Sequence, residues 1–293
     1  MKKNHPARTE RRGFTLIELL VVMGILVALL ALGVMIVPAF KSSSAELGAT
    51  QLQGWLHIAK QRALRDQAPR GLRLFIEPTN GSNNHLVVRR AQYIEVPPDY
   101  RKGRATIPAG SEVCVFSQDI SGGLGGNKNV WPVQAGDYIQ VANGPVRRIL
   151  EVVDGGRARV FPVPSSREDS EDYRIMRHPR PIRGEEVLTL PTNVIVDLAQ
   201  RPNSGQSYQQ FSQYLAHEDH IDILFSPSGE VQTQGPLGKV ILAIRSIEED
   251  RRTASDQTLI TVYCRTGLIA AHPVNLESND RFLYTRDVTA SGL

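Results

Sequence analysis

The most pronounced feature of the sequence is a long apolar segment near its start. From Leu19 to Val37 no side chain carries a charge. A helix over this segment would be about 28 Å long, close to the hydrocarbon thickness of a bilayer. Lipid offers the backbone no hydrogen bonds, so the segment must satisfy them internally. The pattern therefore predicts a membrane-spanning helix over residues 14–38.

A second helical pattern follows, and it is amphipathic. Apolar residues recur at the spacing of one helical face, at Leu52, Leu56, Ala59 and Ala63. Pro38 removes a backbone donor and predicts a kink or break between the two patterns, and Pro69 marks the end of the second. We expect an amphipathic helix over residues 39–70, with its apolar face on a sheet.

Beyond residue 70 the pattern changes to short segments typical of β-strands, separated by turns rich in Gly, Pro and Asn. Among the expected strands are Val113–Phe116, Tyr138–Val141, Tyr173–Met176 and Leu259–Tyr263. The patterns together predict an α+β fold, in which a long N-terminal helix packs on an antiparallel β-sheet domain over residues 71–293.

The distribution of charge favours export of this domain. Residues 1–13 hold five basic residues and one acidic residue, which accounts for the whole formal net charge of +4. The remainder of the chain is close to neutral, so its bulk charge gives no argument for nucleic-acid binding. Basic residues before an apolar segment favour the cytoplasmic side of a membrane. We therefore expect residues 1–13 in the cytoplasm and the β-rich domain outside.

An acidic residue at the start of the apolar segment makes the N-terminus distinctive. Glu18 is favoured by the helix dipole in a first turn, but an ordinary signal anchor gives no reason for it. Residues 11–22 (RRGFTLIELLVV) resemble the prepilin motif of type IV pilins and type II secretion pseudopilins. The resemblance implies that prepilin peptidase cleaves after Gly13 and N-methylates Phe14. It also implies that the new amino group of Phe14 pairs with Glu18 of a neighbouring subunit in a filament.

Other segments extend the resemblance. Residues 59–65 followed by 71–75 are similar to the helix-to-strand junction of minor pseudopilins of the GspH/FimT type, and residues 221–231 and 261–269 are similar to their sheet hairpins. Residues of about 118–182 do not fit this pattern, and we interpret them as a β-rich insertion in a pilin-like domain.

The resemblance implies a structural subunit, not an enzyme, of a type II secretion or type IV pilus-like filament. Its expected location is the bacterial inner membrane, as a single-pass protein with its globular domain in the periplasm or outside the cell. Expected partners are prepilin peptidase, other pilin or pseudopilin subunits, an assembly platform protein with its ATPase, and inner-membrane lipid. An alternative function is a filament-tip binding module for DNA uptake or for recognition of a secreted substrate, so nucleic acid stays open as a partner.

No segment predicts catalytic chemistry, a cofactor or a metal site. The histidines of His217-Glu218-Asp219-His220 are three residues apart in a polar loop, whereas zinc proteases place theirs four apart on a helix. We expect a solvated loop there. Cys114 and Cys264 are not spaced as a metal site, and they could form one disulfide or remain buried free thiols.

Overall fold

The computed structural model describes residues 16–41, 43–78, 86–124, 126–198, 219–232, 238–247, 257–275 and 280–286. Over these residues the chain is mostly β, with an antiparallel sheet of ten strands and another of seven. Two α-helices precede the sheets, α1 (Leu16–Lys41) and α2 (Ser43–Asp66). Two short 3-10 helices, Lys128–Val130 and Leu283–Arg286, lie in loops among the described residues.

The ten-stranded sheet has the order β14-β13-β1-β2-β12-β15-β16-β17, and β10 and β11 also pair with β2. Its strands are β1 (Arg70–Pro78), β2 (Leu86–Glu95), β10 (Arg180–Pro181), β11 (Leu188–Thr189), β12 (Val194–Asp197), β13 (His220–Phe225), β14 (Val231–Gln232), β15 (Lys239–Ser246), β16 (Gln257–Tyr263) and β17 (Leu268–Pro273). The short strands β10, β11 and β12 follow one another along the same partner, so the returning chain covers much of β2.

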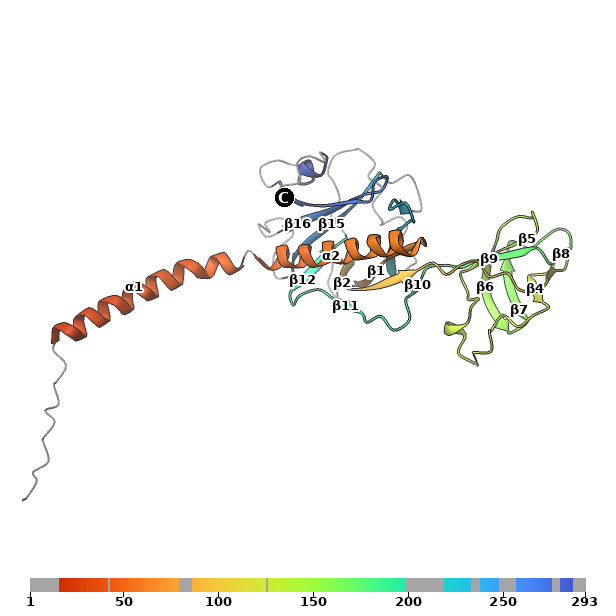
Figure 1. Ribbon diagram of the computed structural model, residues 1–293, viewed down its shortest axis with the longest axis horizontal. Helices are drawn as coiled ribbons and strands as arrows, with labels where there is room; N and C mark the ends of the chain where they lie inside the picture. The colour runs from red at the N-terminus through yellow and green to blue at the C-terminus, as the bar shows by residue number, and fades with distance from the viewer. Residues whose placement is uncertain are drawn as a thin grey trace, which may run out of the picture.

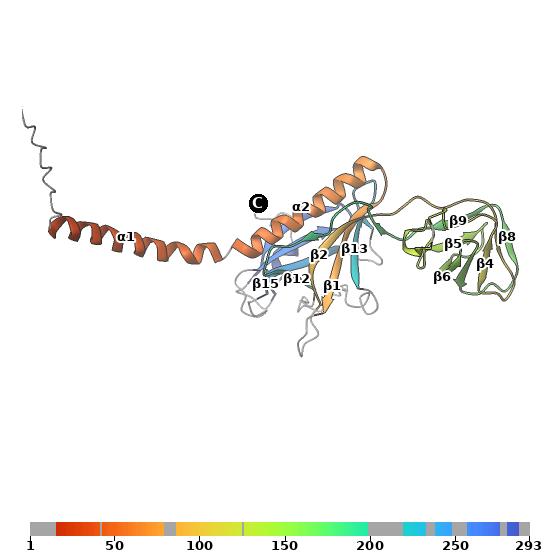
Figure 2. The same ribbon diagram turned by 90° about the horizontal axis from the view of Figure 1, so that it is seen from below.

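Helix α2 lies along one face of this sheet (Figures 1 and 2). Its apolar stripe is buried in the same hydrophobic cluster as residues of the sheet, and it consists of Ala45, Ala49, Leu52, Trp55, Leu56, Ala59 and Ala63. Gly48 allows α2 to approach β12 closely, because a Cβ at this position would lie 2.5 Å from a methyl carbon of Val194. The buried residues of the stripe recur at the spacing of one helical face.

The seven-stranded sheet has the order β8-β3-β4-β7-β6-β5-β9. Its strands are β3 (Ala105–Ile107), β4 (Val113–Phe116), β5 (Tyr138–Val141), β6 (Arg147–Asp154), β7 (Arg157–Phe161), β8 (Glu168–Ser170) and β9 (Tyr173–Met176). Alternate side chains point inward and form a hydrophobic cluster separate from that of the larger sheet, with Phe116, Ile149 and Tyr173 among its members. This sheet lies at the end of the molecule opposite α1 (Figures 1 and 2).

A buried ion pair holds the curl of the seven-stranded sheet. Arg147 of β6 donates from Nη2 to Oε1 of Glu168 in β8 at 2.5 Å, and its side chain is only 5% exposed. The other guanidinium nitrogens reach Oε2 of Glu168 and the carbonyl of Pro162. Strands β6 and β8 are not neighbours in the hydrogen-bonded order, so this contact draws an edge of the sheet back over its own inner face.

The smaller sheet is inserted at one point of the larger one. The chain leaves the ten-stranded sheet at Glu95 and returns at Arg180, and these two residues are paired partners of β2 and β10. Strands β3 and β4 precede residue 118, so the second sheet begins earlier than the sequence indicates.

The expectation of an α+β, pilin-like fold is wrong. The described chain is mostly β, in two curled antiparallel sheets, and one long helix on a single sheet is not found. The helical region is divided into α1, which runs through Pro38 to Lys41, and α2. As far as the chain is described, no helix combines the length and the hydropathy needed to cross a membrane.

Candidate functional site

Helix α1 carries apolar side chains that the rest of the chain leaves uncovered. Its described side chains, at residues 16–27 and 29, are all exposed, and Leu16 and Ile17 reach 84% and 70%. The helix extends away from both sheets (Figures 1 and 2). Burial of apolar surface is the main favourable contribution to association. An apolar helix of this kind is therefore a candidate assembly surface.

Glu18 lies in the first turn of α1 and is exposed. A carboxylate there is stabilised by the backbone N–H groups at the start of a helix. Gly13 and Phe14 lie outside the described residues, so neither the expected cleavage site nor its relation to Glu18 is placed.

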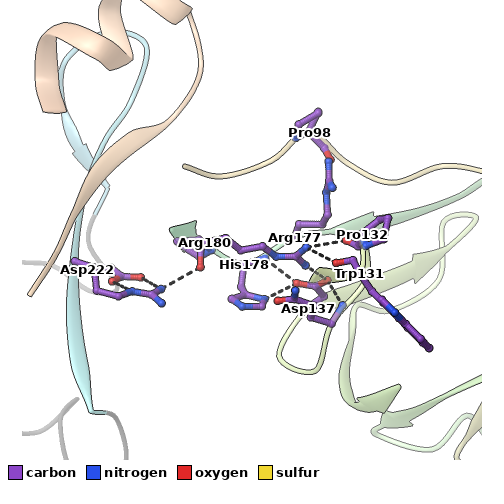
Figure 3. Close-up of polar contacts among 11 residues, drawn as sticks. Pro98, Trp131, Pro132, Asp137, Arg177, His178, Arg180 and Asp222 are labelled. Carbon is purple, nitrogen blue, oxygen red and sulfur yellow. Dashed lines mark hydrogen bonds and ion pairs between the residues drawn. The ribbon is translucent and has the colours of Figure 1, made fainter. Parts of the chain in front are cut away.

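The second candidate region is the junction between the two sheets, which consists of residues 96–104 and 177–179 and the side chains that contact them. Arg180 belongs to β10 of the ten-stranded sheet, but its guanidinium reaches the other sheet (Figure 3). Nη1 donates to the carbonyls of Trp131 at 3.0 Å and Pro132 at 2.9 Å. Nη2 donates to Oδ2 of Asp137 at 2.6 Å. Arg180 thus connects the ten-stranded sheet to the loop that leads into β5 of the seven-stranded sheet.

Asp137 is the acceptor at the centre of the junction, and its side chain is fully buried. It accepts hydrogen bonds from the backbone N–H groups of His178 and Gln134, both at 2.9 Å, and Nδ1 of His178 lies 2.5 Å from its Oδ1. Burial alone would raise the pKa of Asp137. The hydrogen bonds from His178 and the charge of Arg180 outweigh burial, and they hold the pKa below its ordinary value.

Two further arginines fix the connecting segments. Arg73 of β1 forms a bidentate pair with Asp222 of β13, both contacts being 2.7 Å, and its Nη2 donates to the carbonyl of Pro179 at 3.0 Å. Arg177 donates from Nε to the carbonyl of Pro98 at 2.7 Å and so joins the two connecting segments (Figure 3). The junction therefore positions the second sheet with charge-assisted hydrogen bonds.

The junction was not predicted from the sequence. Its one sequence signal is the segment 177–183, which is rich in arginine and proline and ends the expected insertion. The partners of these arginines are far away in the chain, so the pattern alone could not assign them.

A shallow hollow of about 480 Å³ lies on the smaller sheet beside the junction, lined in part by Phe116, Asp119, Trp131 and Gly155. Asp119 accepts hydrogen bonds from the backbone N–H of Ser121 at 2.8 Å and from its hydroxyl at 2.6 Å. These hydrogen bonds lower the pKa of Asp119. The carboxylate is thus engaged within its own loop.

The two cysteines are free thiols and both are buried. Cys114 belongs to the hydrophobic cluster of the seven-stranded sheet and Cys264 to that of the ten-stranded sheet. The disulfide considered from the sequence is therefore not formed, because the two thiols lie in different cores.

The histidine-rich loop is only partly described. His217 and Glu218 lie outside the described residues, whereas His220 begins β13 and its Nδ1 lies 2.7 Å from Oδ1 of Asp219. Among the described residues, no group of three or more His, Cys, Asp or Glu side chains is placed to hold a metal ion.

Comparison with known proteins points to the N-terminus. Residues 8–37 match the family model of the prokaryotic N-terminal methylation motif, a range that includes Gly13, Phe14 and Glu18. The match supports a prepilin-processed protein of the pilin or pseudopilin type in general. It implies processing by prepilin peptidase and assembly with other pilin subunits, and it suggests a membrane-anchored, exported protein.

No curated protein matches the sequence. Among solved structures, the phage phi92 endosialidase is similar over 70% of this chain, with 14% sequence identity and a TM-score of 0.19. This chain spans 36% of that protein's length. A likeness of this size supports no conclusion about the fold or the activity.

Proposed function

We propose that the chain is a minor pilin or pseudopilin, of the GspH/FimT type, that joins a type II secretion or type IV pilus-like filament through α1. The observation that carries the proposal is the methylation motif of residues 8–37, which leads directly into a helix with exposed apolar side chains. The corresponding helices of other subunits would cover this surface. Its role is structural, and we propose no catalytic activity.

The proposed assembly begins with processing at the inner membrane. Cleavage after Gly13 removes the basic residues that hold the N-terminus on the cytoplasmic side. The new amino group of Phe14, methylated by the same peptidase, then pairs with Glu18 of a neighbouring subunit. Both groups would be poorly solvated among apolar helices, so the pair can set the axial register more strongly than an exposed ion pair.

Assembly needs further partners because moving an apolar helix out of lipid is unfavourable until protein contacts replace the lipid. Each CH₂ group buried in lipid contributes about 0.8 kcal/mol to the free energy that holds the helix in the membrane. An assembly platform protein and its ATPase would supply the work, and both sheets would remain outside the membrane as the exposed part of the subunit.

The test is the variant Glu18→Ala, with Glu46→Ala in the first turn of α2 as the matched control. Mass spectrometry should show that the parent chain and both variants begin at methylated Phe14. Incorporation of Glu18→Ala into filaments should fall about tenfold or more, as expected when an interaction worth about 1.4 kcal/mol is lost. Glu46→Ala should assemble normally. A mature N-terminus elsewhere, or normal incorporation of Glu18→Ala, would contradict the proposal.

A further inference from the structure

The outer face of the seven-stranded sheet presents an arginine between two aromatic residues. Arg148 of β6 is directly opposite Tyr138 of β5 on one side and Phe161 of β7 on the other. Directly opposed residues of neighbouring antiparallel strands lie about 5 Å apart at Cβ. All three side chains are exposed, Phe161 to 59% and Tyr138 to 44%.

Two exposed apolar side chains flank Arg148 along the chain. Val146 and Leu150 lie two residues before and after Arg148 and are about as exposed as Tyr138. Isolated exposed apolar residues are normal on a protein surface, whereas a contiguous group of them marks an interaction site. We call Tyr138, Val146, Arg148, Leu150, Phe161 and Arg174 the Arg148 patch.

The cations of the Arg148 patch lack acidic partners. Among the described residues Arg148 forms no ion pair, and Arg174 of β9 donates from Nε only to the amide oxygen of Gln140 at 2.9 Å. Other arginines of the same face are paired with carboxylates. Arg159 pairs with Glu112 at 2.7 Å and with Glu151 at 3.7 Å, and Arg157 pairs with Asp154 at 2.6 Å. Arg148 and Arg174 thus differ from these arginines in having no carboxylate partner among the described residues.

This composition identifies the class of partner. The centres of protein–protein interfaces are rich in Tyr, Phe and Arg and poor in Lys, Asp and Glu. We propose that the Arg148 patch binds a protein segment that places a carboxylate between apolar side chains, with the carboxylate on Arg148 and the apolar groups on Tyr138 and Phe161. A nucleic acid fits less well, because Arg148 and Arg174 are only two cations for its phosphates and Val146 and Leu150 offer no hydrogen bonds to phosphates or bases.

The patch is separate from the proposed assembly helix. It lies on the sheet farthest from α1 (Figure 1). The proposal therefore does not rest on the filament function, and each can fail without the other.

The experiment measures binding of four probes to the purified full-length chain. They are a synthetic peptide that alternates leucine and aspartate, its counterpart with lysine in place of aspartate, polyglutamate, and single-stranded oligo-dT. The leucine–aspartate peptide should bind most tightly. Its affinity should fall about tenfold or more in Arg148→Glu and in Phe161→Ala, as is usual for central interface residues.

Two control variants separate the patch from general effects. Arg157→Glu makes the same change in charge on the same face, and Val115→Ala removes an exposed apolar side chain of β4. Both should bind the peptide as the parent chain does. The proposal is overturned if the leucine–aspartate peptide does not bind, if oligo-dT or polyglutamate binds as tightly, or if Arg148→Glu and Arg157→Glu weaken binding equally.

Discussion

The two sheets bury their apolar faces in different ways. The ten-stranded sheet uses α2, whose stripe of small and large side chains lies in the same cluster as its strands. The seven-stranded sheet has no helix on its inner face among the described residues, and it curls over its own core instead. Closure depends on a polar contact, the ion pair of Arg147 with Glu168. The comparison indicates two cores of separate stability in one chain.

The chain offers a natural way to observe each core. Its two tryptophans are divided between them, with Trp55 in the cluster under α2 and Trp131 in the cluster of the smaller sheet. Replacement of one tryptophan by phenylalanine leaves the other as the reporter of its own sheet.

The largest effect is expected from Arg147→Ala. Replacement of Arg147 leaves the carboxylate of Glu168, whose side chain is only 15% exposed, without its partner, and breaking a buried ion pair costs about 3–5 kcal/mol. Urea denaturation followed through Trp131 should show this loss, while the Trp55 signal stays close to that of the parent chain. Arg148→Ala, at the adjacent exposed position, should change neither signal by more than about 0.5 kcal/mol. Equal shifts in both signals would show that the two cores unfold together.

A similar but smaller loss is expected from Leu56→Ala in the other core. Leu56 of α2 is fully buried in the cluster of the larger sheet, and replacement of a buried leucine by alanine costs about 2–5 kcal/mol through lost burial and the cavity left behind. Here the Trp55 signal should shift and the Trp131 signal should not. The control is Leu64→Ala on the same helix, where the side chain is 40% exposed and the expected change is within about 0.5 kcal/mol. A dominant shift at Trp131 would contradict the assignment of α2 to the larger sheet.

The alternation of apolar and polar side chains along the sequence predicted where the strands lie better than it predicted which strands share a sheet. The expected strands Val113–Phe116, Tyr138–Val141 and Tyr173–Met176 agree with β4, β5 and β9. Alternation shows which residues point inward, but it does not show which of two cores they enter. Two separate sheets were therefore interpreted as one domain with an insertion, and β4 was placed on the wrong side of its boundary.

The two candidate regions also differ in how far the sequence alone reveals them. The N-terminal motif is contiguous, so Gly13, Phe14 and Glu18 could be recognised from the sequence and the family comparison matches their region. The junction is assembled from residues far apart, since Asp137 meets His178 and Arg180 across 41 and 43 positions. Only the three-dimensional structure brings them together.

The junction should weaken in acid. The pKa of Asp137 is lower in the folded chain than its ordinary value of 3.8, so its contribution to stability is complete above about pH 5 and is lost as the pH falls through the folded-state pKa. Other carboxylates of the smaller sheet also have lowered pKa values, among them Asp119, Asp154 and Asp169. The measurement is therefore the difference in Trp131 stability between the parent chain and Asp137→Asn. This difference should be about 1–3 kcal/mol at pH 7, as for a lost hydrogen bond to a buried charge, and should shrink below pH 4. A constant difference would show that Asp137 does not titrate as argued.

The smallest and most local effect concerns the two thiols. Burial raises the pKa of Cys114 to about 12 and also raises that of Cys264, so both remain protonated at pH 8. Because only the thiolate is nucleophilic and both side chains are buried, alkylation requires opening of the surrounding sheet. Arg147→Ala should therefore accelerate alkylation of Cys114 alone, and Leu56→Ala that of Cys264 alone, as followed by peptide mass spectrometry. Faster alkylation of both thiols in either variant would mean that opening of one sheet also opens the other. The junction would then couple the unfolding of the two sheets as well as fix their relative position.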